Sequence, residues 1–354
     1  MARRSLPRSL TLLRILLTFA GGNGHFQPLA VLARIASQRG HSVAFACQSG
    51  MTASVRAEGF VAYDTGGTTL LTSSTRVTLL ELDSSREDRA VRHTFAGNVA
   101  RERARALKAL CAAWHPDVVV RDEVDFGAAV AAEQLGLPHA SVLVIAAGVL
   151  VRHSLQPFIG STRSSEPEWL AQLEPPIVYF TLGTIFNLES GDLFERVLGA
   201  LADLPGSSVV TVGRELDPIQ FGKLPRRIRL ERYIPQESVL PRCSLVVSHA
   251  GSGSVMGALM HGLPSVLLPM GADQPHNAAR CADLDVARVL DAVHASSAEI
   301  RSAIADVLAS PAYVAAAREM RSEIQGLPPV EYGVDLLERL ATTREPLHRA
   351  EAQA

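Results

Sequence analysis

A glycine- and serine-rich turn is the densest group of residues able to bind a ligand. His249-Ala250-Gly251-Ser252-Gly253-Ser254 follows an apolar run, residues 245–248, and precedes a helical pattern. Small residues at such a turn let backbone N–H groups approach an anion. The helix N-terminus adds about 0.3–1 kcal/mol of attraction when exposed. With the side chains of His249, Ser252 and Ser254 as further donors, the turn predicts a diphosphate site. A tight turn without any ligand would have a similar composition.

Polar side chains also follow two other apolar runs. Asp273-Gln274 comes after the run 265–268, and Tyr233-Ile234-Pro235-Gln236 comes after the run 228–232. The carboxyl ends of parallel strands meet at one sheet edge, so these residues are expected to face the same cleft. A carboxylate accepts and an amide both donates and accepts, which suits sugar hydroxyls. An aromatic ring at Tyr233 could stack on a nucleobase, although core packing is the ordinary role of a tyrosine.

The elements that must position these residues alternate between strand and helix. In the first half, strands are expected at 12–19, 42–47, 118–120 and 140–145, with helices at 26–39 and 86–114. Continuous apolar runs indicate strands that are buried on both faces of a parallel sheet. The second half repeats this order, with strands expected at 177–181, 208–212, 228–232, 245–248, 265–268 and 286–290, and helices at 192–204, 252–261, 275–284, 301–308, 315–325 and 334–341.

A proline-, glycine- and serine-rich stretch at 156–176 divides the two halves. The predicted fold is therefore α/β, with two doubly wound Rossmann-like domains facing across a cleft. We expect an N-terminal domain at 1–155, a linker at 156–176, a C-terminal domain at 177–340 and a polar tail at 341–354.

Composition excludes several classes of protein. The 354 residues are 47% apolar and 20% charged, with a formal net charge of −2, so a packed core is possible and no basic excess favours nucleic acid as a partner. The four cysteines are far apart and form no C-x-x-C pair, which suits a cytoplasmic protein. No apolar run reaches the roughly 18–20 residues of a transmembrane helix. Arg3, Arg4 and Arg8 precede the apolar residues 10–20, as in a signal peptide, but a buried first strand is the preferred interpretation because no cleavage site follows.

The segment from His249 to Asn277 reads H-A-G-S-G-S-V-M-G-A-L-M-H-G-L-P-S-V-L-L-P-M-G-A-D-Q-P-H-N. It closely resembles the donor-binding signature of family 1 glycosyltransferases with the GT-B fold, in particular the bacterial enzymes that glycosylate macrolides, enediynes and other natural products. The resemblance extends to Phe180-Thr181-Leu182-Gly183-Thr184 and to Tyr233–Gln236. In the first half it includes Gly24-His25-Phe26-Gln27-Pro28-Leu29 and residues 116–122.

The resemblance implies a role for each matching residue. His25 matches the base that activates the acceptor, and Asp122 matches the carboxylate that orients this histidine. The chemistry agrees, because histidine titrates near working pH and a carboxylate on its far ring nitrogen fixes the tautomer. The implied donor-binding residues are Thr184, His249, Gly251, Ser252, Gly253 and Ser254 at the diphosphate, Tyr233 and Gln236 at the nucleoside, and Asp273 and Gln274 at the sugar.

The implied activity is inverting transfer of a sugar from a dTDP- or UDP-sugar to a hydroxyl of a small hydrophobic natural product. The nucleotide sugar is a co-substrate, and neither a bound cofactor nor a divalent metal is implied; a homodimer is possible. Acidic residues at 122–125 and 283–285 could be mistaken for metal-binding motifs, and the second stretch is interpreted as a helix end.

Two departures from the family pattern stand out. Gly257 occupies a position where the family often has a glutamate that holds the ribose hydroxyls, which favours a deoxyribose nucleotide and hence dTDP. The chain also looks several tens of residues short between the expected strands at 140–145 and 177–181, where part of the acceptor pocket would lie.

Three alternatives remain open. A dinucleotide-dependent oxidoreductase is suggested by Gly251-x-Gly253 but disfavoured by Gly257, which breaks the G-x-G-x-x-G spacing. A GT-B epimerase or phosphorylase is disfavoured by the pairing of His25 with Asp122. The third alternative is a non-catalytic sugar-nucleotide-binding or auxiliary homologue, to which the short middle segment lends weight.

Overall fold

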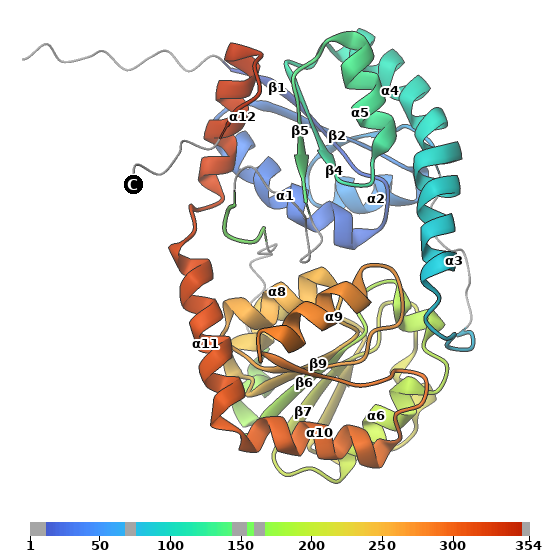
Figure 1. Ribbon diagram of the computed structural model, residues 1–354, viewed down its shortest axis with the longest axis vertical. Helices are drawn as coiled ribbons and strands as arrows, with labels where there is room; N and C mark the ends of the chain where they lie inside the picture. The colour runs from blue at the N-terminus through green and yellow to red at the C-terminus, as the bar shows by residue number, and fades with distance from the viewer. Residues whose placement is uncertain (1–11, 68–75, 144–153, 159–166, 349–354) are drawn as a thin grey trace, which may run out of the picture.

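A computed structural model describes residues 12–67, 76–143, 154–158 and 167–348. The molecule consists of two α/β domains that lie one above the other along its longest axis (Figure 1). The N-terminal domain contains a five-stranded parallel sheet in the order β3-β2-β1-β4-β5. Its strands are β1 (Arg14–Thr18), β2 (Ser42–Cys47), β3 (Val61–Asp64), β4 (Val118–Asp122) and β5 (His139–Val142).

Alternate residues of β1 face opposite sides of this sheet. Ile15 and Leu17 pack in a core with Phe26, while Leu16 packs on the other face with Leu107 and Ala128. Both faces are therefore apolar, as the continuous runs predicted. The covering helices are α1 (Asn23–Gln38), α2 (Ser49–Ala57), α3 (Ser84–Arg89), the π-helical segment η1 (Ala90–Val99), α4 (Ala100–Trp114) and α5 (Phe126–Leu135).

The C-terminal domain contains a six-stranded parallel sheet in the order β11-β10-β9-β6-β7-β8. The strands are β6 (Ile177–Thr181), β7 (Ser207–Thr211), β8 (Ile228–Glu231), β9 (Leu245–Ser248), β10 (Ser265–Leu267) and β11 (Ala287–Val289). The helices are α6 (Leu193–Ala202), α7 (Gln236–Val239), α8 (Ser252–Met260), α9 (Gln274–Asp283), α10 (Ser297–Ala309), α11 (Pro311–Gly326) and α12 (Glu331–Thr343), with 3₁₀ turns at Glu168–Gln172, Phe186–Glu189, Pro218–Phe221 and Leu240–Arg242. None of the helices in the described parts of the chain has the length and apolar character needed to cross a membrane.

The expected strands and helices are confirmed, with differences of a few residues at their ends. Of the strand expected at 140–145, residues 144 and 145 lie outside the described residues. Apart from the 3₁₀ turns, four elements were not anticipated: α2, β3, α5 and α7. The helix expected at 86–114 is present, but ten of its residues form the π-helical segment η1. The helix expected to begin at residue 26 begins at Asn23, so His25 lies in its first turn and not before it.

The last helix crosses from the C-terminal domain to the N-terminal domain. In Figure 1, α11 and α12 run along one side of the molecule, and α12 lies beside the N-terminal sheet. Val334 and Leu337 of α12 are buried in the same core as Phe26. An ion pair between Arg39 and Asp335, 2.5 Å between Nη1 and Oδ1, fixes α12 to the end of α1. The residues expected to end the C-terminal domain therefore stabilise the N-terminal one.

A second connection runs in the opposite direction. The segment that follows β3 reaches the C-terminal domain, where the Val77 N–H donates to the carbonyl of Leu188 (2.6 Å) and the Val77 carbonyl accepts from Gly191 (3.0 Å). Arg76 forms a two-point ion pair with Glu195, at 2.9 and 2.5 Å. The two domains are thus joined at α12 and at this segment, in addition to the chain between them.

Candidate active site

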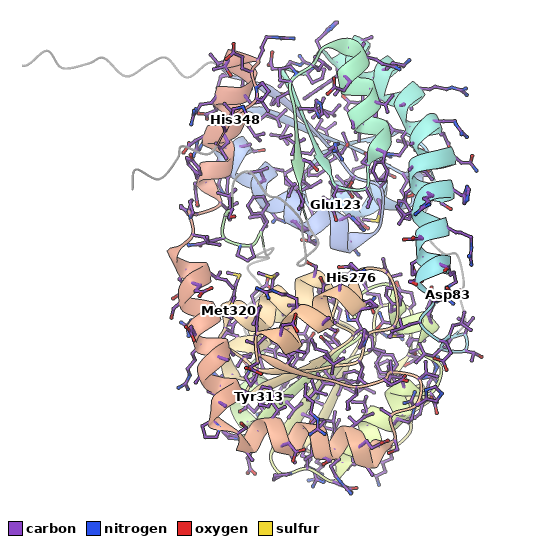
Figure 2. All side chains as sticks on the ribbon, viewed as in Figure 1. Asp83, Glu123, His276, Tyr313, Met320 and His348 are labelled. Carbon is purple, nitrogen blue, oxygen red and sulfur yellow. The ribbon has the colours of Figure 1, made fainter. Side chains whose placement is uncertain are left out.

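A cleft of about 2190 Å³ lies between the domains. Eleven of the twelve predicted site residues line it, among them His25 from the N-terminal domain and His249 and Asp273 from the C-terminal domain. Figure 2 shows Glu123 and His276, which also line the cleft, on the facing edges of the two domains. The twelfth residue, Asp122, is fully buried behind His25. The sequence-based set therefore converges on one place.

His25 is held against Asp122 by the local backbone. Nδ1 of His25 lies 2.8 Å from Oδ2 of Asp122, and the imidazole is 24% exposed while the carboxylate is fully buried. Asp122 is the last residue of β4, and His25 follows β1, the neighbouring strand, in the first turn of α1. A Cβ atom at Gly21 would lie 2.3 Å from Cδ2 of His25, so glycine at position 21 makes room for the ring.

Backbone N–H groups hold both oxygens of the Asp122 carboxylate. Oδ1 accepts from the N–H of Asp125 at 2.7 Å, and Oδ2 accepts from the N–H of Ala20 at 3.3 Å. Burial of a carboxylate is costly unless its oxygens are satisfied. The carboxylate is therefore fixed on the side of His25 away from the cleft, where it can orient the ring.

The surroundings of His25 favour its protonated form. Burial by itself lowers the pKa of His25, but the close contact with the Asp122 carboxylate and the charges of Asp122, Glu123 and Asp273 outweigh burial, so the pKa is raised above its ordinary value. A raised pKa makes the neutral imidazole a stronger base once the pH exceeds that value.

His249 has the opposite environment. Burial lowers its pKa to about 4, and a hydrogen bond to the backbone of Thr181 opposes this only in part. Cβ atoms at Gly183 and Gly251 would lie 2.7 Å and 2.4 Å from its ring, so two glycines make the space that it occupies. His249 is therefore a neutral group at pH 7, and it can offer an N–H but no positive charge to an anion.

The helix α8 begins at Ser252, and the residues of its first turn line the cleft. Ser254 is buried in the first turn, where its Oγ accepts from Nε2 of Gln236 at 3.4 Å. Gln236 is also close to Gly257, because a Cβ there would lie 3.0 Å from its Oε1. The side chain of Gln236, at the start of α7, thus contacts the first turn of α8 beside the predicted diphosphate site.

Asp273 and Gln274 differ in how freely they can contact a ligand. Asp273 Oδ2 accepts from Nδ2 of Asn277 at 2.7 Å, and the same amide donates to the Ala250 carbonyl at 3.0 Å. Gln274 is 1% exposed, and its Oε1 accepts from the N–H groups of Met270 (2.8 Å) and Gly271 (3.3 Å). The side-chain carbonyl of Gln274 therefore holds the loop that precedes Asp273. This structural role was not predicted from the sequence.

Tyr233 is 47% exposed and lies at the nucleoside end of the predicted site. Cζ of Arg214 lies 4.5 Å from the centroid of its ring. Arg214, which sequence analysis did not single out, covers one face of the ring, so a nucleobase would stack on the other face or displace the guanidinium. Thr184, in the loop after β6, is exposed to the cleft.

Sequence analysis also missed a buried ion pair beneath the His25–Asp122 pair. Arg103 of α4 and Asp125, which caps α5, have fully buried side chains and meet at 2.6 Å. Asp125 belongs to the acidic stretch 122–125, but nothing in the sequence indicated that Arg103 is its partner. Among the described residues, a possible metal-ligand set occurs at Glu81, Asp291 and His294; it is exposed, and its residues do not line the cleft.

Sequence comparisons match this chain to known proteins over part of its length. Residues 195–339 match the family model described as erythromycin biosynthesis protein CIII-like, C-terminal domain. Tylactone mycaminosyltransferase of Streptomyces fradiae is 32% identical over 225 residues, 62% of this chain and 46% of that protein. 4'-Demethylrebeccamycin synthase of Lentzea aerocolonigenes is 31% identical over 176 residues, 49% of this chain and 41% of that protein. The chain thus matches less than half of the length of these two relatives.

The structural likeness is more extensive. The spinosyn rhamnosyltransferase SpnG, solved with thymidine diphosphate, has a TM-score of 0.79 at 20% identity, covering 92% of this chain and 100% of that one. At this level of identity the likeness shows the fold. The chain therefore has the GT-B fold, and its residues 195–339 match the model of the erythromycin biosynthesis protein CIII-like C-terminal domain.

Proposed function

We propose that the protein is an inverting glycosyltransferase that moves a sugar from a nucleoside diphosphate to a hydroxyl of a small hydrophobic natural product. The observation that carries this proposal is the position of His25, which lines the cleft opposite the first turn of α8 and is backed by buried Asp122. The mycaminosyltransferase and demethylrebeccamycin synthase relatives and the structural likeness to SpnG support it.

In the proposed mechanism, neutral His25 removes the proton of the acceptor hydroxyl through Nε2. The oxygen then bonds to the anomeric carbon from the face opposite the nucleotide, and the bond from that carbon to the diphosphate oxygen breaks. The proton stays on His25, whose imidazolium Asp122 stabilises, and the electron pair leaves with the nucleoside diphosphate. N–H groups of α8 and the neutral ring of His249 are placed to stabilise the developing charge on that leaving group.

The proposed donor is a dTDP-sugar in preference to a UDP-sugar. Position 257 has no side chain to hold ribose hydroxyls, and a Cβ there would approach Gln236 at 3.0 Å and Leu240 at 3.2 Å. A contact to a 2′-hydroxyl is therefore absent at this position, and a deoxyribose loses nothing by lacking that hydroxyl.

The proposed acceptor is apolar because apolar side chains from both domains line the cleft. The side chains of Val91, Phe95 and Phe158 line it from the N-terminal side, and Ile185, 39% exposed, lines it from the C-terminal side. An aglycone with one free hydroxyl would bury its carbon surface here at about 25 cal/mol per Å². The short segment between the domains lies largely outside the described residues, so its expected effect on the acceptor pocket stays a prediction.

Thermal denaturation with dTDP, UDP, GDP and NAD tests the donor half of the proposal. A ligand at 100 times its Kd should stabilise the fold by about 2.7 kcal/mol. We expect stabilisation by dTDP, a smaller one by UDP, and none by NAD. A shift with NAD alone would favour the oxidoreductase, whereas dTDP binding without transfer to any hydroxyl acceptor would favour the non-catalytic homologue.

A further inference from the structure

The fully buried pair of Arg103 and Asp125 has no role in the proposed mechanism. The guanidinium donates twice to the carboxylate, from Nε to Oδ1 at 3.0 Å and from Nη2 to Oδ2 at 2.6 Å. A buried ion pair is weak evidence of a stabilising role, because desolvation of both charges offsets their attraction. The pair therefore invites an explanation other than stability.

The surroundings of Arg103 are built to hold it in one position. Its Nη1 donates to Thr65 Oγ1 (3.0 Å) and to the carbonyl of Gly66 (3.2 Å), and Nη2 donates to the carbonyl of Ala46 (3.3 Å). Cβ atoms at Gly67 and Gly127 would each lie 2.8 Å from its side-chain carbons. All three nitrogens of the guanidinium donate hydrogen bonds, so the side chain cannot rotate without breaking several of them.

Asp125 connects Arg103 to Asp122, the residue that contacts the predicted base His25. Its carboxylate is held by Arg103, by Thr18 Oγ1 (2.7 Å) and by the N–H of Ala128 (3.1 Å). Its own backbone N–H donates to Oδ1 of Asp122 at 2.7 Å. Burial by itself would raise the pKa of Asp125, but the guanidinium of Arg103 outweighs burial and holds that pKa below its ordinary value, so the pair stays ionised.

We propose that Arg103 is a positioning residue for His25: through Asp125 it fixes the carboxylate of Asp122 against the imidazole. The chain of contacts runs from the guanidinium to the Asp125 carboxylate, from the Asp125 N–H to Asp122, and from Asp122 to Nδ1 of His25. The inference rests on the proposed function, in which His25 is the base. The other charges that face His25 are those of Glu123 and Asp273.

The test replaces both buried charges at once. The double variant Arg103→Met, Asp125→Asn leaves no unpaired buried charge and keeps an acceptor for the N–H of Ala128, because asparagine caps helices well. The matched control is Arg39→Met, Asp335→Asn, which removes an ion pair at the other end of α1. Circular dichroism and thermal denaturation establish that each variant folds.

The primary measurement is the pKa of His25, obtained by NMR titration of its ring in the free protein. We expect this pKa to fall in the double variant, because the Asp122 contact that raises it is loosened, and to stay unchanged in the control. With active protein, kcat should fall by roughly tenfold or more with the Kd for dTDP unchanged. A folded double variant that titrates His25 at the wild-type pKa would overturn the inference.

Arg103→Lys supplies a second variant in case the double variant does not fold. Lysine keeps the charge but cannot donate to both carboxylate oxygens in the fixed geometry of a guanidinium. It should shift the pKa of His25 in the same direction by less and retain more of kcat; no shift in a folded protein would count against the inference. The NMR titration needs no turnover, so a wild-type protein without transfer activity would contradict the proposed function without deciding the role of Arg103.

Discussion

The ring of His249 occupies space that exists only because residue 251 is glycine, since a Cβ at that position would lie 2.4 Å from Nε2. The ring also lies close to Gly183. It packs beside Phe186, and the centroids of the two rings are 6.0 Å apart. The start of α8 and the loop after β6 therefore hold one histidine between them, facing the predicted diphosphate site.

Gly251→Ala should displace this ring and weaken the binding of dTDP. The methyl group would overlap the ring, so the turn or the histidine must shift. We expect the Kd for dTDP, measured by calorimetry, to rise about tenfold or more. Gly326→Ala is the matched control, because a Cβ at position 326 meets no atom within 4 Å and the residue does not line the cleft. Equal affinities of the two variants would show that the position of His249 does not matter for binding.

Asp122→Asn should shift the acid limb of the pH profile of kcat/KM. The pKa of His25 is raised, so its base form accumulates only above that pKa and activity rises with pH through it. Loss of the carboxylate charge lowers that pKa, and the acid limb should move to lower pH while kcat falls. Because both oxygens of Asp122 accept backbone N–H groups, the amide also leaves one N–H unmatched, and a lower melting temperature is expected. An acid limb at the wild-type pH would mean that another group is titrating.

Asp273→Ala should weaken the binding of the sugar part of the donor. The carboxylate lines the cleft and is kept in place by the amide of Asn277. The Kd of the nucleotide sugar should rise several-fold while the Kd of the free nucleoside diphosphate changes little. Calorimetry with both ligands separates the two effects. If both affinities fell equally, the sugar-contact role would be wrong.

Gly257→Glu should bring the affinity of the protein for UDP closer to its affinity for dTDP. A glutamate on this face of α8 brings an acceptor for ribose hydroxyls, but its Cβ requires Gln236 to move by a few tenths of an ångström. We expect the Kd for UDP to fall about tenfold relative to the Kd for dTDP, which is the effect of one hydrogen bond. Gly257→Met adds a side chain of similar length without a strong hydrogen-bond acceptor, and serves as the control. An unchanged ratio would remove position 257 as the origin of nucleotide preference.

The sequence allowed much of this arrangement to be predicted, for physical reasons that differ between residues. Buried parallel strands give long apolar runs, so the strands that lead to Asp122 and His249 were found. The strand β3 was not found, because it has only four residues and Val61 is exposed. Gly251 and Ser254 were found because small residues after a strand indicate a ligand-binding turn. Arg103 was missed because one charged residue on a helix usually faces solvent, and only the folded chain brings it to Asp125.

The start of α1 and the role of Gln274 depended on backbone geometry that residue types do not encode. Asn23 begins the helix without a side-chain cap, so the sequence offered no signal three residues before Phe26. Gln274 directs its carbonyl to two backbone N–H groups of its own loop. Side chains that support the backbone and side chains that contact ligands have the same chemistry. The two roles are distinguished only by the position of each side chain in the folded structure.

The transfer activity of His25→Ala tests the central claim most directly. Wild-type protein and variant are compared with a dTDP-sugar and a hydroxyl-bearing hydrophobic acceptor, with the Kd for dTDP measured in parallel. The account predicts a loss of roughly 10²–10⁴-fold in kcat with the Kd for dTDP nearly unchanged. Transfer at the wild-type rate by a folded His25→Ala variant would contradict the assignment of His25 as the base and, with it, the proposed mechanism.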